Sequence, residues 1–212
     1  MSRRVLIVTA VQAEADVIGR PNGSFVVVGG IGRTNAAAAT TAAMMADGPF
    51  TWVINAGVAG VLPHNNLSLG DVVIADKCIY AEEGLMTKDG FQDMQQMGFE
   101  LGNFEGNEVP VDKWMLEQLG SIGNVASIAT VATCSGSDEQ ANLIQERTGS
   151  ACEAMEGAAV VHAAQRLCAP AIEIRVISNT TGNRETQEWD LDLALANLGD
   201  AVQASITALW GE

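Results

Sequence analysis

Two carboxylates and one amide, Glu14, Glu156 and Asn179, have the side-chain types that cleavage of an N-glycosidic bond requires. That reaction builds positive charge on a ribose and negative charge on the departing base. A site for it needs a positioned nucleophile at the sugar, acceptors for the sugar hydroxyls and a donor at the base. These three residues could divide the tasks among them if the fold brings them together.

Each of the three lies just beyond an expected strand or at an expected helix start. Short apolar runs rich in β-branched residues alternate with segments that favour helices. Gly57 and Gly60 are expected to end the third strand, and Gly19 the first helix. The expected strands cover residues 5–10, 25–30, 52–56, 71–80, 125–133 and 171–177, and the later helices cover 34–46, 112–119, 138–147, 155–167 and 192–209.

This alternation predicts an α/β fold over a single domain, residues 1–212. We expect a three-layer α/β/α sandwich around a mixed, mostly parallel twisted sheet. Ligands of such sheets gather at the carboxyl ends of the strands. Segments rich in Gly, small or polar residues fall at these ends, and they comprise residues 10–14, 29–33, 55–60, 133–137 and 178–184.

The composition narrows the classes of partner. Hydrophobic residues make up 48% of the chain and aromatic residues 5%, which predicts a core of Ala, Val, Ile and Leu. The formal net charge of −15 argues against nucleic acid, whose binding depends on Lys and Arg. Because no run of about 18 apolar residues and no signal peptide is recognised, we expect no membrane partner and a soluble, cytoplasmic protein.

The four cysteines and two histidines form no metal-binding pattern. We therefore expect no metal and no cofactor, with reduced and mostly buried thiols. Residues 82–110 are polar and contain several glycines, and we interpret them as a long functional loop.

Four motifs, in this order, resemble those of the nucleoside phosphorylase and nucleosidase superfamily. They are Gly-Gly-Ile-Gly-Arg at 29–33, Asn-Ala-Gly-Val-Ala-Gly at 55–60, Met-Glu-Gly-Ala-Ala at 155–159 and Arg-Val-Ile-Ser-Asn at 175–179. The segment 178–184, followed by Trp189, looks most like the futalosine hydrolase family. That family releases hypoxanthine from futalosine in an alternative menaquinone pathway, leaving dehypoxanthine futalosine. The resemblance implies a small-molecule nucleoside substrate and a homo-oligomer, dimeric or higher.

The resemblance also implies roles for single residues. In the related methylthioadenosine/S-adenosylhomocysteine nucleosidases, a glutamate after the first strand activates the attacking water, and Glu14 matches it. Glu156 matches the glutamate that accepts hydrogen bonds from the ribose hydroxyls, and Met155 the methionine that packs against the sugar. Gly57 and Ser178, inside the matching motifs, are expected to bind substrate. From the residues alone, Glu14 could instead be an ordinary helix-start carboxylate, and Met155 could fill the core.

Asn179 replaces the aspartate that those nucleosidases use at N7 of adenine. An amide can donate to N7 and to an exocyclic oxygen, whereas a carboxylate would repel that oxygen. Asn179 therefore favours hypoxanthine or guanine as the base. The alternative is that Asn179 is only a capping residue. Arg184 is the candidate to grip the benzoate carboxylate of futalosine, unless it is a surface arginine. Thr133, Ser135 and Ser137 lie where relatives contact the base.

Hydrolysis is favoured over phosphorolysis by what the motifs lack. The phosphorylases hold phosphate with arginines and a serine, partly in the segment that matches 55–58, where Asn55 and Val58 supply no cation. Arg33 follows a glycine turn at a helix start and remains a candidate anion contact. Three alternatives stay open. The protein could be a phosphorylase, which would need phosphate, or a methylthioadenosine nucleosidase, which Asn179 disfavours. It could also be a nucleoside-binding protein without catalytic activity, which would not need the two glutamates.

Overall fold

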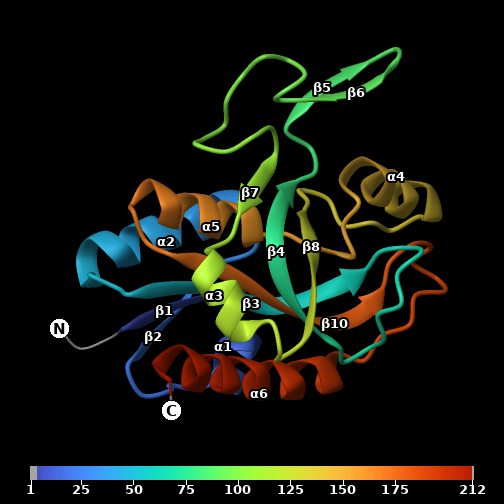
Figure 1. Cartoon of the computed structure of the whole chain (residues 1–212). Helices are drawn as coiled ribbons and strands as arrows, with labels where there is room; N and C mark the ends of the chain where they lie inside the picture. The colour runs from blue at the N-terminus through green and yellow to red at the C-terminus, as the bar shows by residue number, and fades with distance from the viewer. Residues whose placement is uncertain (1–3, 212) are drawn as a thin grey trace.

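The computed structural model describes residues 4–211, and it has a sheet between two groups of helices (Figure 1). The predicted three-layer α/β architecture is therefore confirmed. The strands are β1 (Val5–Thr9), β2 (Ser24–Val28), β3 (Trp52–Val61), β4 (Val72–Tyr80), β5 (Gly84–Thr87), β6 (Gly90–Asp93), β7 (Glu108–Pro110), β8 (Asn124–Thr130), β9 (Cys152–Ala154) and β10 (Ala171–Thr180). The helices are α1 (Gln12–Ile18), α2 (Arg33–Asp47), α3 (Lys113–Leu119), α4 (Asp138–Thr148), α5 (Gly157–Arg166) and α6 (Leu191–Trp210).

The main sheet is mixed, and its strand order is β10-β4-β8-β9-β3-β1-β2. Parallel pairs include β1 with β2 and β3, while β10 pairs antiparallel with β4. Because β10 also pairs in parallel with β3, the five strands β10, β4, β8, β9 and β3 close into a ring. This closure brings the ends of β3, β9 and β10 together.

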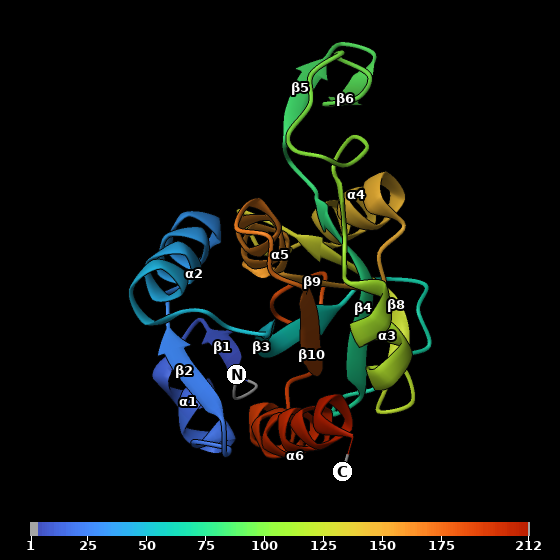
Figure 2. The ribbon, with the colours of Figure 1, turned by 60° about the vertical axis from the view of Figure 1, so that its left-hand side comes forward.

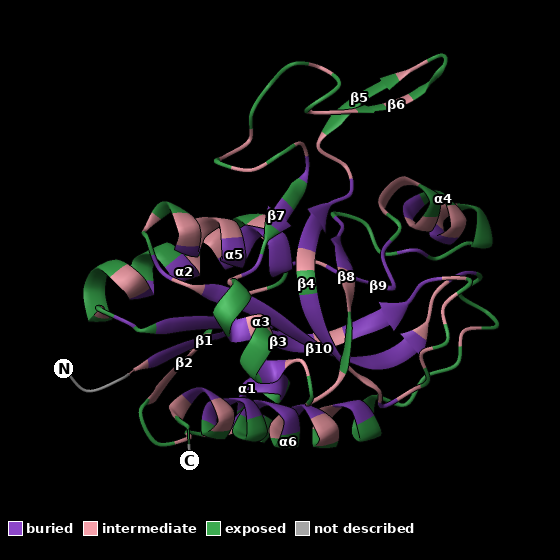
Figure 3. Cartoon of the chain, in the orientation of Figure 1, coloured by how far each residue is buried: buried purple, intermediate pink, exposed green. Residues whose placement is uncertain are grey.

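Helices cover the sheet from opposite sides. On one side α1 and α3 pack against α6, and on the other α2 packs against α5 (Figure 2). The strands are largely buried, whereas the helices are exposed on their outer faces (Figure 3). In α6 the buried residues Ala194, Leu198, Ala201 and Val202 recur at the three- to four-residue spacing of one helix face.

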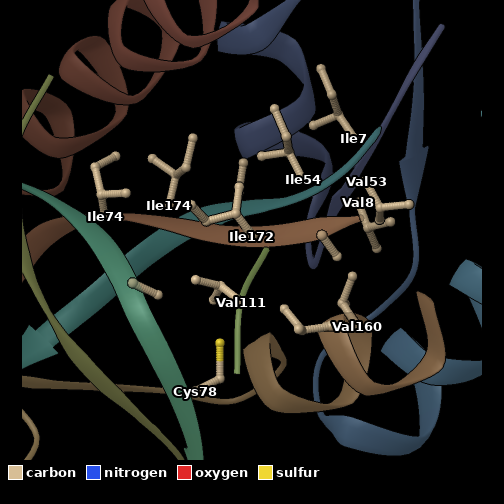
Figure 4. Close-up of a cluster of buried hydrophobic side chains, with 14 of the residues drawn as sticks. Ile7, Val8, Val53, Ile54, Ile74, Cys78, Val111, Val160, Ile172 and Ile174 are labelled. Atoms are coloured by element: carbon tan, nitrogen blue, oxygen red, sulfur yellow. The ribbon is translucent and has the colours of Figure 1, made fainter. Parts of the chain in front are cut away.

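The core between these layers is aliphatic, as the composition predicted. Ile7, Ile54, Ile172 and Ile174 come from three neighbouring strands and are completely buried (Figure 4). Val160 of α5 approaches from the helical layer and is also completely buried. Each such side chain stabilises the fold by about 1.5–3 kcal/mol through removal of apolar surface from water.

Several element boundaries were predicted wrongly. β3 passes through Gly57 and Gly60, which were expected to end it, and β10 runs on to Thr180. The two strands pair with each other over this extra length, and their ladder of hydrogen bonds outweighs the low strand propensity of glycine. α5 begins at Gly157, so Met155 lies before the helix rather than in it.

Residues 82–110 are not one long loop. They contain a hairpin of β5 and β6, which projects from the body of the molecule (Figure 1), and β7, which pairs with β4. The thiols also depart from prediction, because Cys78 and Cys152 are buried whereas Cys134 and Cys168 are exposed. No helix within residues 4–211 combines the length and apolar character needed to cross a membrane.

Candidate active site

A cavity of about 540 Å³ lies where the five predicted segments meet. Every segment contributes to its wall, as expected for the carboxyl ends of strands in an α/β sheet. From the first to the fifth segment, lining residues include Glu14, Ile31, Val58, Ser135 and Asn179. Residues 82–110 do not line this cavity.

Glu14 is fixed against the wall by backbone N–H groups. Its Oε2 accepts from the N–H of Ala10 at 2.9 Å and of Val11 at 3.2 Å, and its Oε1 accepts from the N–H of Val58 at 3.1 Å. Val11 is the N-cap of α1, so Glu14 at the third helical position accepts from the N-cap N–H, and the Val11 side chain itself accepts no bond. The start of α1 thus holds a carboxylate that is only 3% exposed at the cavity.

Glu156 lies at the N-cap of α5 and is 4% exposed. Its Oε1 accepts from the N–H of Gly32 at 2.9 Å, and its Oε2 accepts from Arg175 Nη2 at 3.2 Å. Met155 beside it is half-buried, and it both lines the cavity and packs against a small apolar cluster that includes Ile144. The two interpretations of Met155 are therefore compatible.

Arg175 of β10 stands behind the cavity and is 1% exposed. Its Nε donates to Glu173 Oε1 at 2.7 Å, and its Nη1 donates to the carbonyl of Val58 at 3.3 Å. Its Nη2 donates to Asn55 Oδ1 and to Glu156 Oε2. Asn55 also donates to the carbonyl of Val8 at 2.9 Å, so it belongs to the buried support of the site rather than to its wall.

Charge and burial act in opposite directions on this buried group. Burial alone lowers the pKa of Arg175, but the carboxylates of Glu173, Glu156 and Glu14 raise it above its ordinary value. Burial also raises the pKa of Glu173, and the nearby Arg175 opposes that rise. Arg175 is therefore a permanent cation that compensates the carboxylates around the cavity.

Gly57 of β3 leaves room beside the strand for two of these charged groups. A Cβ at this position would run into Arg175 Nη1 and Glu14 Oε1. Gly57 does not itself border the cavity, and its contribution is the space that it leaves behind Glu14. A larger residue at this position would displace the Glu14 carboxylate and the Arg175 guanidinium from β3.

A β-bulge brings Ser178 and Asn179 into the cavity together. In the pairing of β10 with β3, Ile177 faces Ala59 and Asn179 faces Gly60, so Ser178 is the extra residue. A bulge re-aims side chains, and here two consecutive residues both line the cavity. Ser178 Oγ lies 2.8 Å from Asn179 Oδ1, to which it donates, and Asn179 Nδ2 donates to the carbonyl of Thr180 at 2.9 Å. The second N–H of the amide is left for a ligand.

Arg184 lies at the exposed rim of the cavity. Its Nη1 donates to Gln187 Oε1 at 2.9 Å, and its guanidinium carbon is 4.7 Å from the centroid of the Trp189 ring. Gln187 in turn donates from Nε2 to the carbonyl of Ser135 at 3.0 Å. The rim is thus joined to the segment 134–136 by a chain of polar contacts.

Other predicted residues lie outside the cavity. Arg33 does not line it, and its Nη1 is 2.5 Å from Glu83 Oε1, with Glu82 at 3.6 Å. Thr133 is exposed and not part of the wall. Ser137 is the N-cap of α4, where its hydroxyl accepts from the N–H of Gln140.

Comparison with known proteins identifies the family. The model of the phosphorylase superfamily matches residues 22–210. A futalosine hydrolase from Acidothermus cellulolyticus is 35% identical, with 99% of this chain and 93% of that protein covered. The chain belongs to the futalosine hydrolase family. This confirms the resemblance that the four motifs and the segment 178–184 predicted.

Two solved structures share the fold of this family member. A futalosine hydrolase mutant of Helicobacter pylori superposes with a TM-score of 0.76 at 18% identity, covering 99% of this chain and 97% of that one. A 5′-methylthioadenosine/S-adenosylhomocysteine nucleosidase from Colwellia psychrerythraea, in complex with adenine, gives 0.80 at 21% identity, with 99% and 96% covered. At these identities the similarity bears on the fold alone, so the choice of base has to come from individual side chains.

The sequence interpretation missed two features of this family member's site. Glu173 and Arg175 stand two residues apart in the otherwise apolar run 171–177, so they point to the same face of the strand. That pattern is a recognisable signal for a buried ion pair. Glu153 of β9 lines the cavity and is 5% exposed, but its strand of three residues is too short to recognise. In the part of the chain that the structure describes, no His, Cys, Asp and Glu side chains are grouped to hold a metal ion.

Proposed function

We propose that this protein hydrolyses the N-glycosidic bond of futalosine and releases hypoxanthine and dehypoxanthine futalosine. The observation that carries the proposal is the meeting of Glu14, Glu156 and Asn179 around one cavity. Two carboxylates and an amide are the groups that such a reaction needs at the sugar and at the base. Membership of the futalosine hydrolase family supports the choice of substrate.

In the proposed reaction, Glu14 accepts a proton from water, and the water oxygen bonds to the anomeric carbon. The bond from that carbon to the base breaks, and its electron pair leaves with the base. The base takes up a proton from solvent to give hypoxanthine, and Glu14 returns its proton to solvent. Glu156 accepts hydrogen bonds from the ribose hydroxyls and holds the ring, with Met155 packed against it. Asn179 donates its remaining N–H to the base and stabilises the negative charge that develops there.

The ion pairs that Arg33 and Arg175 already form support water rather than phosphate as the nucleophile. Arg33, the candidate anion contact, is paired with Glu83 and Glu82 away from the cavity. The basic residues in the wall are Arg175 and Arg184. Arg175 already donates to Glu173 and Glu156, so a phosphate would have to compete with both.

Asn179 supports hypoxanthine as the base. Its Oδ1 already accepts from Ser178, which orients the Nδ2 donor, whereas an aspartate would present only acceptors to the oxygen of a 6-oxopurine. Arg184 is the proposed contact for the benzoate carboxylate of futalosine. Its position at the rim supports this, although Gln187 and Trp189 already contact its guanidinium.

Base release from futalosine, inosine and methylthioadenosine, each with and without phosphate, tests the proposal. We expect hypoxanthine release from futalosine at a rate that phosphate leaves unchanged. Glu14→Gln should lower kcat by about 10²–10⁴-fold, the usual contribution of a positioned general base. Glu117→Gln, on the exposed surface of α3, is the matched control. Turnover that requires phosphate, or preference for methylthioadenosine, would contradict the proposal.

We also propose that the enzyme works in the cytoplasm as a homo-oligomer and serves menaquinone synthesis by the alternative pathway. The resemblance to the futalosine hydrolase family supports the second and third statements. Light scattering after size exclusion gives the mass of the assembly, and a monomer at micromolar concentration would contradict the second. Loss of menaquinone on gene deletion, restored by the intact gene but not by one encoding Glu14→Gln, tests the third.

A further inference from the structure

A buried carboxylate in the cavity wall has no role in the reaction described above. Glu153 is 5% exposed, and both of its bonded partners belong to Ser135. Oε1 accepts from the N–H of Ser135 at 2.7 Å, and Oε2 accepts from its hydroxyl at 2.6 Å. None of the ion pairs among residues 4–211 involves Glu153. Each oxygen of the Glu153 carboxylate therefore has a further lone pair, which can accept a hydrogen bond from a ligand in the cavity.

The register of the sheet places Glu153 at the base end of the cavity. On one side of β3, Gly60 pairs with Glu153, and on the other side it pairs with Asn179. Neighbouring strands are about 4.8 Å apart, so the two residues stand across Gly60 with their backbones roughly 10 Å apart. Gly60 therefore has a carboxylate on one side and an amide on the other, and both side chains line the cavity.

The sugar end lies further back along the same strand. Val58, whose N–H binds Glu14, precedes Gly60 by two residues, or roughly 7 Å of extended chain. A nucleoside with its anomeric carbon at Glu14 therefore brings its base between Asn179 and Glu153. Gly60 keeps this passage open, since a Cβ there would lie 2.9 Å from Asn179 Nδ2.

We propose that Glu153, oriented by Ser135, accepts the N1–H of the base and thereby selects a 6-oxopurine over a 6-aminopurine. This inference rests on the proposed function. Hypoxanthine carries a proton on N1 and presents an oxygen at position 6, so it donates to Glu153 while it accepts from Asn179. Adenine presents a lone pair at N1, which meets the lone pairs of the carboxylate. Two residues on opposite sides of Gly60 thus read adjacent atoms of one base edge.

The burial of Glu153 also has an electrostatic consequence. Desolvation raises the pKa of Glu153, and the two bonds from Ser135 oppose that rise. Ser135 therefore does two things: it fixes the direction of the carboxylate and it favours the ionised, accepting form. The second effect is the one that discrimination against adenine requires.

Selectivity, rather than activity alone, tests this inference. The measurement is the ratio of kcat/KM for futalosine and for its 6-amino analogue, with the affinities for free hypoxanthine and adenine by calorimetry as a second readout. Glu153→Gln keeps the shape and adds an N–H that can serve adenine. We expect it to lower the 6-oxo to 6-amino ratio by about 10- to 100-fold. Glu117→Gln should leave the ratio unchanged.

A change of ligand gives an independent test on the same site. 1-Methylhypoxanthine lacks the N1–H and is bulkier there, so the wild type should bind it at least about tenfold more weakly than hypoxanthine. Glu153→Ala removes the acceptor and opens space, so it should lose affinity for hypoxanthine and gain affinity for the methylated base. A purely structural role would weaken both bases together.

The outcomes separate the two proposals. If the wild type does not hydrolyse futalosine, the proposed function fails, and the base titrations still decide on Glu153. If the wild type prefers the 6-oxopurine and Glu153→Gln leaves that ratio within twofold, the proposed function stands and the assignment of Glu153 is wrong.

Discussion

Removal of the Arg175 guanidinium tests the electrostatic support of the site. Arg175→Met keeps most of the apolar volume but leaves Glu173, which is completely buried, without its cation. Glu156, 4% exposed, loses the same partner. Breaking a buried pair in this way costs about 3–5 kcal/mol, out of a total stability of about 5–15 kcal/mol for a typical domain.

For a chain of this length, about 1 kcal/mol corresponds to about 2–4 °C in Tm, so the variant should melt roughly 6–20 °C lower. Urea unfolding gives the free energy, and calorimetry gives Tm. The double variant Glu173→Gln, Arg175→Met removes the stranded charge together with its partner. We expect it to recover about 1–3 kcal/mol relative to Arg175→Met.

Two results would refute this reasoning. One is a loss of less than about 1 kcal/mol for Arg175→Met, which would mean that water or a shifted side chain compensates Glu173. The other is a double variant no more stable than the single one, which would mean that packing, and not charge, explains the loss. Activity supplies a further check, since misplacement of Glu156 should raise KM even where the variant remains folded.

Three further predictions concern single positions. Gly57→Ala should lower the free energy of unfolding in urea by about 1–3 kcal/mol, because its Cβ would meet Arg175. Gly136→Ala has open space around its Cβ, so its free energy of unfolding should stay within about 0.5 kcal/mol of the wild type. Asn179→Asp should move the kcat/KM ratio toward 6-aminopurine nucleosides by about 5- to 150-fold, and an unchanged ratio would remove the amide from base recognition. Burial, followed by the charge of Arg166, lowers the pKa of His162, so the unfolded chain binds the proton more readily than the folded one. Stability should therefore fall as pH drops below the ordinary histidine range, and His162→Gln should flatten the dependence of Tm on pH in that window.

Much of the fold follows from local patterns in the chain. Apolar runs such as residues 52–56 and 171–177 predicted strands, and the Ala-rich segment 34–46 predicted α2, because burial and propensity agree there. The five segments were also placed correctly at one cavity. Four of them belong to the carboxyl-terminal parts of β1, β2, β3 and β10 or follow directly after them, and these strands run parallel, so their ends share an edge. The fifth follows β8, which the closed ring brings to the same place.

What the sequence did not predict depends on contacts between distant segments. β9 has three residues and exists because β3 and β8 pair with it on either side. The closed ring needs β10 to meet both β3 and β4, and the bulge at Ser178 appears only in that pairing. Glu153 was missed for the same reason, because its place in the wall is set by its partners and not by its neighbours in the chain.

The features that the sequence did not predict lie away from the two glutamates proposed to act at the sugar. The backbone that presents Glu14 and Glu156 is set by the starts of α1 and α5. The proposed contacts to the base lie instead on either side of Gly60, on the bulge of β10 and on the short strand β9. A substitution at Asn179 or Glu153 changes which hydrogen bonds the wall offers without moving the groups at the sugar. Variants at Glu153 should therefore change the preferred base, variants at Asn179 should change both the preferred base and the rate, and Glu14→Gln should lower the rate on every substrate.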